Sequence, residues 1–268
     1  MEAKFPIFDF VKQSFVQTFA YGKGLLITLG VVVALVAAAF AVFAVIGFLS
    51  AASGGSAGGM IAGFLITIVL GLYATGWIFN FWVRYGAEGR ENLLPNGFAA
   101  SLTPALATGL KLLFIAILLG IVAVVIIMIT GILGLGVKFN EIATLAQMDT
   151  VQAVKALGIV YLIIFGVTCS VYSIFSSNLT KTALGREDEE IGEPHVLEFA
   201  LVLFLIYAAV YIPTTLMQSV MPEIAALLVE AFAGFLLGAL IPVAHGLRYD
   251  WQRQVYASRT QGGDMPSE

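Results

Sequence analysis

Six long stretches of the chain are almost entirely hydrophobic, and short polar segments separate them. A helix needs roughly 20 apolar residues to cross the hydrocarbon core of a bilayer. Each stretch reaches or approaches that length, so the pattern predicts six transmembrane helices. Their expected bounds are Leu25–Leu49, Met60–Trp82, Leu112–Val137, Ala156–Ser177, Phe199–Leu216 and Ile224–Ala244.

The polar segments contain two weaker helical patterns. From Phe5 to Tyr21, large apolar residues recur at helical spacing and polar residues fill the other face. This pattern predicts an amphipathic helix in the plane of the membrane interface, with a helix that binds a soluble partner as the alternative. A second such helix is expected over Phe98–Gly109, unless Pro104 instead starts the next span.

Composition supports a membrane protein. The chain is 60% hydrophobic and 11% charged, whereas soluble domains carry about 25% charged residues. The predicted fold is all-α: a polytopic membrane helical bundle of six transmembrane helices after an N-terminal interfacial amphipathic helix. The expected parts are the interfacial helix (1–24), the membrane domain (25–247) and a cytoplasmic C-terminal tail (248–268).

The basic residues orient this arrangement. With six spans, eleven of the 13 Lys and Arg residues fall on one side, and only Lys138 and Lys155 fall on the other. Cytoplasmic loops carry the excess of basic residues in membrane proteins. Both termini are therefore expected in the cytoplasm, whereas five or seven spans would split the basic groups between the two sides.

A short motif follows two of the spans. Gly89-Arg90-Glu91 follows the second and Gly185-Arg186-Glu187 follows the fourth. Each predicts a helix that extends beyond the bilayer, stops at the glycine and continues with charges that cannot enter lipid. The sixth span is expected to end in the same way at Gly246. The match is either a true internal repeat or a coincidence of basic residues at inner helix ends.

The segment after the second span carries a family resemblance. The stretch from Arg84 to Pro95, followed by Gly109-Leu110-Lys111-Leu112 before the third span, resembles six-helix bacterial membrane proteins related to the membrane domain attached to glycerophosphodiester phosphodiesterases. The resemblance implies this fold and a bacterial inner (cytoplasmic) membrane location. In that family the membrane domain is not the catalytic part, so no catalytic residue is carried over.

A candidate polar or coupling site lies in the later spans. Glu230 is the one carboxylate clearly within a span, and such a group is a candidate proton or cation site. Alternatively it is solvated near the outer interface, or paired with Lys138 or Lys155. The other members of this candidate site are Thr214, Gln218, Ser170 and Ser173. The two serines belong to a stripe of small residues that favours packing against another helix, with a polar lining as the alternative.

Charged residues at the inner ends of spans are the other candidate functional residues. Lipid-headgroup contacts are predicted for His245, Arg248, Arg84 and Lys111. Arg84 and Glu88 are four residues apart, which predicts a surface ion pair. The acidic run 187–190 is expected to be a solvated loop, with a docking site for a basic partner as the alternative.

No motif for catalysis, cofactor binding or metal binding occurs, and no basic domain suggests nucleic-acid binding. The favoured function is a non-enzymatic membrane scaffold or accessory subunit that organises lipids or partner membrane proteins. Its expected partners are membrane lipids and, through small-residue helix faces, another protein or a second copy. The alternative is a small-solute or lipid transporter with a polar path near spans four to six. An intramembrane enzyme would need a catalytic constellation that the sequence does not contain.

Overall fold

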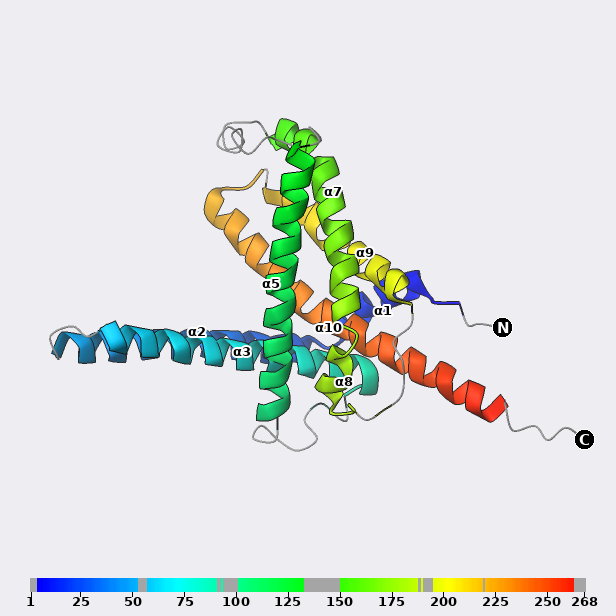
Figure 1. Cartoon of the computed structure of the whole chain (residues 1–268), viewed down its shortest axis with the longest axis horizontal. Helices are drawn as coiled ribbons and strands as arrows, with labels where there is room; N and C mark the ends of the chain where they lie inside the picture. Colours follow the sequence, from blue (N-terminus) through cyan, green and yellow to red (C-terminus); the bar gives the residue numbers. More distant parts are fainter. Residues whose placement is uncertain are drawn as a thin grey trace, which may run out of the picture. The chain divides into compact units, whose positions relative to one another are not determined.

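The computed structural model describes residues 4–52, 57–90, 93, 101–132, 150–187, 189, 195–218 and 220–262. Regular structure in these residues is α-helical throughout (Figure 1). The helices are α1 (Ile7–Ala20), α2 (Gly22–Ala52), α3 (Ala57–Glu88), α5 (Leu102–Ile132), α7 (Thr150–Phe175), α8 (Leu179–Leu184), α9 (Val196–Gln218) and α10 (Glu223–Gly262).

Several of these helices fit a membrane. Within the described residues, five are long and apolar enough to cross one, namely α2, α3, α5, α9 and α10. The fourth predicted span corresponds to α7, whose apolar part Ile163–Phe175 is shorter over the residues with described side chains. The described residues are thus helical as predicted, and five apolar helices of this length support a multi-pass membrane protein. The number of six spans stays a prediction.

Two of the three predicted glycine stops are confirmed. Gly89 and Gly185 have φ angles of 73° and 69°, a left-handed conformation in which a side chain is strained. The amide of Gly89 donates to the carbonyl of Tyr85 at 3.0 Å, and the amide of Arg186 donates to the carbonyl of Lys181 at 2.9 Å. These bonds satisfy carbonyls that a helix end would otherwise leave free.

The prediction of a third stop, at Gly246, is wrong. Helix α10 continues through Gly246 to Gly262, so most of the predicted tail 248–268 is helical. The side chains of Tyr249 and Gln252 are buried there. Packing of this extension against the protein outweighs the local signal to stop, because it buries side chains that a free tail would expose to water.

The prediction of a separate helix over Phe98–Gly109 is also wrong where the structure describes it. Helix α5 begins at Leu102 and passes through Pro104 in its first turn, where a missing amide proton costs no helical hydrogen bond. Pro104 therefore starts the span, as the alternative proposed. Residues 98–100 lie outside the described part.

Helix α1 is present where an N-terminal helix is expected. Its large side chains Phe8 and Phe19 are exposed, whereas Phe10, Ser14 and Thr18 are buried. Exposed phenylalanines are available to a membrane interface, and the placement of α1 there stays a prediction.

The chain divides into two compact units, of which the first comprises residues 1–12, 114–177 and 192–237. Its centre is the packing of α7 on α9. The ring of Phe165 lies 6.0 Å from that of Tyr207 and 5.9 Å from that of Tyr211. The buried hydroxyl of Ser173 donates to the carbonyl of Val196 at 2.7 Å, so this serine of the small-residue stripe faces another helix.

The second unit comprises residues 13–113, 178–191 and 238–268. Helices α2 and α3 run side by side in it as a hairpin (Figure 1). The fully buried indole of Trp82 donates to the hydroxyl of Thr28 at 2.9 Å. The ring of Tyr21 stacks on that of Tyr85 at 4.8 Å. These contacts fasten the end of α3 to the beginning of α2.

Glycines let α3 approach two other helices of this unit at backbone distance. A Cβ atom added to Gly76 would lie 1.8 Å from the carbonyl oxygen of Ala105 in α5, and one added to Gly246 of α10 would lie 2.3 Å from that of Val83. Such contacts are possible only where the side chain is absent. By contrast, Gly234 and Gly238, which form a G-x-x-x-G match in the sequence, have no atom within 4 Å of an added Cβ.

Candidate functional site

Charged side chains of the second unit gather around the short helix α8. We call this group the α8 cluster: α8 itself with Arg186, Glu187 and Glu189 after it, Arg84 and Glu88 of α3, Lys111 of α5, and Tyr249 of α10. Helix α8 has six residues, and Leu179, Ala183 and Leu184 are buried, which holds it against α3. Its stop at Gly185 turns the chain so that the following charges meet α3 and α10.

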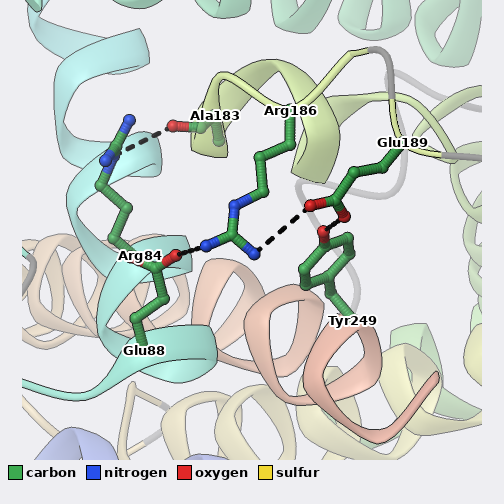
Figure 2. Close-up of polar contacts among 6 residues, drawn as sticks. All are labelled: Arg84, Glu88, Ala183, Arg186, Glu189 and Tyr249. Atoms are coloured by element: carbon green, nitrogen blue, oxygen red, sulfur yellow. Dashed lines mark hydrogen bonds and ion pairs between the residues drawn. The ribbon is translucent and has the colours of Figure 1, made fainter. Parts of the chain in front are cut away.

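Arg186 is the centre of the cluster (Figure 2). Its Nη2 lies 2.5 Å from Oε1 of Glu88, and its Nη1 lies 3.6 Å from Oε1 of Glu189. The hydroxyl of Tyr249 donates to the other oxygen of the Glu189 carboxylate. Arg186 thereby links α3 directly, and α10 through Glu189, to the segment after α8.

The environment of Arg186 keeps its guanidinium charged. Hydrogen bonding with Tyr249 is the largest cause that raises its pKa, and the charge of Glu88 adds to it, against partial loss of hydration. An arginine is already cationic at physiological pH. Within the cluster, then, it acts as a permanent positive charge.

Two further cations converge on α8. The Nε of Arg84 donates to the carbonyl of Ala183 at 3.1 Å (Figure 2). The Nζ of Lys111 donates to the hydroxyl of Thr182 at 2.5 Å and lies 3.7 Å from Oε1 of Glu187. Because Thr182 and Ala183 are neighbours in the last turn of α8, both cations reach the same end of this helix.

The structure alters two predictions made for these residues. Glu88 pairs with Arg186, whereas the predicted partner Arg84 binds a backbone carbonyl. Glu187 and Glu189 bind residues of this chain, namely Thr182, Lys111, Arg186 and Tyr249, so they are not simply solvated. Asp188 and Glu190 of the same acidic run lie outside the described residues.

His245 and Arg248 are buried in the second unit, which differs from the headgroup contacts predicted for them. Nδ1 of His245 lies 3.3 Å from the hydroxyl of Thr180, and its ring lies 5.6 Å from that of Phe79. The reason is the continuation of α10, which carries both side chains into the protein. Arg84 is half-buried and Lys111 is partly exposed, so for these two the headgroup prediction remains open.

The candidate coupling residues of the first unit are not joined to one another by any hydrogen bond that the structure gives. The hydroxyls of Thr214 and Ser170 donate to carbonyls of their own helices, those of Val210 and Gly166, both at 2.8 Å. The amide of Gln218 is 3.4 Å from the carbonyl of Ala226, and Glu230 is exposed on α10. Lys138 and the side chain of Lys155 lie outside the described residues, so the pairing suggested for Glu230 is a prediction still.

None of the protein-family models, curated proteins or solved structures compared with the chain matches it. Function therefore has to be inferred from the chemistry of the cluster itself. Among the described residues, no group of three His, Cys, Asp or Glu side chains could hold a metal ion. The α8 cluster contains cations, carboxylates and hydroxyls, which suit the fastening of helices and the binding of anions.

Sequence reasoning missed the roles of Glu88, Arg186 and Tyr249. Their partners are far apart in the chain: Arg186 and Glu88 are separated by 98 positions, and Tyr249 and Glu189 by 60. The one local signal was the glycine stop at Gly185, which predicts that the charges after it leave the helix axis. It does not specify which helices they reach.

Proposed function

We propose that this chain is a non-enzymatic membrane scaffold or accessory subunit, which organises lipids or partner membrane proteins. The observation that carries the proposal is the use of its polar side chains. Ser173 and Thr214, candidates for a polar path, donate to backbone carbonyls, and the charges of the α8 cluster bind one another. The contacts of Ser173 and of Arg186 join different helices and stabilise their packing, and all of these engaged groups leave fewer donors for a moving solute.

The location belongs to the same proposal. Six spans, with both termini in the cytoplasm of a bacterium and the α8 cluster at the inner surface, agree with the distribution of Lys and Arg along the chain. The layout resemblance to membrane domains attached to glycerophosphodiester phosphodiesterases supports a non-catalytic role. Broad apolar helix surfaces, with Phe40 and Phe48 of α2 among the exposed side chains, offer contact area to lipid or to a partner helix.

Reconstitution separates this role from the transporter alternative. In proteoliposomes, a scaffold should give no flux of protons, of entrapped small solutes or of fluorescent phospholipids above that of empty vesicles. Crosslinking in cells at native expression should recover the same lipid or membrane-protein neighbours repeatedly. A solute or lipid flux that responds to a pH gradient, and is lost in Glu230→Gln at unchanged thermal stability, would contradict the scaffold and support the transporter.

A further inference from the structure

The position of Lys111 along α5 sets its depth in a membrane. The residues after it, Leu112–Ile132, carry no charge. These 21 residues span about 31 Å at 1.5 Å per residue, the thickness of the hydrocarbon core. If α5 crosses the membrane, Lys111 therefore lies at the edge of the hydrocarbon, at the level of lipid phosphates. Arg84 is the first charged residue of α3 after the uncharged stretch 57–83.

Lys111 forms a long, solvent-exposed ion pair with the carboxylate of Glu187. One oxygen of Glu187 accepts from the hydroxyl of Thr182 at 2.9 Å and lies 3.7 Å from the ammonium nitrogen of Lys111. The Glu187 side chain is 66% exposed and that of Lys111 is 44% exposed. The Arg186–Glu88 pair differs, since it is closer and its carboxylate side chain is only 12% exposed. Exposed pairs of the first kind contribute little to stability, so Glu187 can leave at small cost.

A second cation, Arg84, binds the residue that follows Thr182 in α8, and the charge of Glu88 also acts on it. Arg84 binds the carbonyl of Ala183, next to Thr182, and is absent from the ion pairs found among the described residues. A half-buried guanidinium attracts an anion because burial removes part of its hydration. The site thus combines an ammonium, a hydroxyl and a nearby guanidinium, which are donors that phosphate oxygens accept from.

We propose that the phosphate of an anionic phospholipid binds between Lys111 and α8, where it replaces the carboxylate of Glu187. Its oxygens accept from the Lys111 ammonium and the Thr182 hydroxyl, and the charge of Arg84 favours a net negative headgroup. Glu187 is an internal occupant that competes with the lipid. The inference rests on the proposed function only in that lipids are among the molecules the chain organises.

Lipid retention by the purified full chain tests this site. The protein in detergent is mixed with phosphatidylglycerol, phosphatidylcholine or inorganic phosphate, and bound adducts are counted by native mass spectrometry. Phosphatidylglycerol should be retained in preference to phosphatidylcholine. Lys111→Gln should weaken its retention about fivefold, since one basic residue near the membrane surface contributes about 1 kcal/mol. Glu187→Gln should strengthen retention, because the competing charge is gone.

Lys23→Gln is the matched control, because Lys23 is an exposed lysine at the beginning of α2 in the same unit. Its removal should leave retention unchanged, and Lys111→Arg should keep the preference. Equal losses of phosphatidylglycerol retention in Lys111→Gln and Lys23→Gln would contradict the proposed site. If Lys111→Gln unfolds, Glu187→Gln alone tests the site. Unchanged lipid retention in this variant of an exposed residue would contradict the proposed competition between Glu187 and the lipid phosphate. Inorganic phosphate that displaces the lipid at equal concentration would overturn the lipid assignment in favour of free phosphate. None of these results depends on flux or on protein partners, so the site can fail while the scaffold proposal stands.

Discussion

At the scale of single residues, the same residue type has opposite roles along α10. Gly246 meets the backbone of α3, whereas Gly234 borders open space. Both lie inside the helix, where glycine is normally a destabilising choice. Only the contact with α3 distinguishes them, and no local pattern in the sequence reveals that contact.

Gly246→Ala should therefore lower the free energy of unfolding by about 1–3 kcal/mol, because the added methyl group meets a backbone oxygen that cannot move aside. Gly234→Ala, on the same helix, should be neutral or stabilising by about 0.5–1 kcal/mol. Thermal unfolding of both variants in one detergent measures the difference. Equal shifts of the two variants would show that α3 and α10 do not meet at Gly246.

The ion pair between Arg186 and Glu88 should be energetically coupled. It is short, and the side chains are 30% and 12% exposed, so solvent screens it less than a surface pair. A double-mutant cycle with Arg186→Gln and Glu88→Gln should give a coupling above about 0.5 kcal/mol. The same cycle on Lys111 and Glu187 should give less, since that pair is longer and more exposed. A reversed order would contradict the assignment of Arg186 as the centre of the α8 cluster.

At the scale of helices, packing rather than a polar path explains Ser173. Ser173→Ala removes a buried hydrogen bond between α7 and α9 and leaves a carbonyl with one donor fewer, which should cost about 1 kcal/mol. Ser170→Ala should cost less, because the Ser170 hydroxyl bonds only its own helix. Chemical or thermal unfolding of the two alanine variants tests this. A Ser173→Cys variant that reacts rapidly with a water-soluble thiol reagent would instead indicate a polar cavity.

The long helices were largely predictable, because each contains an apolar run that local sequence displays, whereas the separate short helix α8 was not predicted. The stops at Gly89 and Gly185 were predictable as well, since a glycine followed by charges is a local signal. The continuation of α10 was not, because it depends on burial of Tyr249 against distant residues. The α8 cluster was hidden for the same reason: Arg186 meets its partners only after α3, α8 and α10 have assembled.

At the scale of the whole molecule, topology is the property that can be tested most directly. Alkaline phosphatase, which is active only outside the cytoplasm, should be active when fused after Ser56 and inactive when fused after Gln261. The reason is the concentration of Lys and Arg in the loops and tails assigned to the cytoplasm. The two fusions serve as each other's control for expression. Activity after Gln261, or its absence after Ser56, would exclude the six-span arrangement with both termini inside.

The close approach of α3 to α10 also has a consequence for biosynthesis. Helix α10 follows α3 and α8 in the chain, so the ribosome completes it after them. Until Gly246 and Tyr249 emerge, the Gly86 face of α3 and the carboxylate of Glu189 lack the contacts that α10 supplies. The contacts of α10 with α3 and with Glu189 therefore form only after translation of α10, and a nascent chain halted before it leaves the Gly86 face of α3 uncovered. Membrane proteases and chaperones that survey unfinished helices would therefore meet this chain in an open state until its last described helix is made.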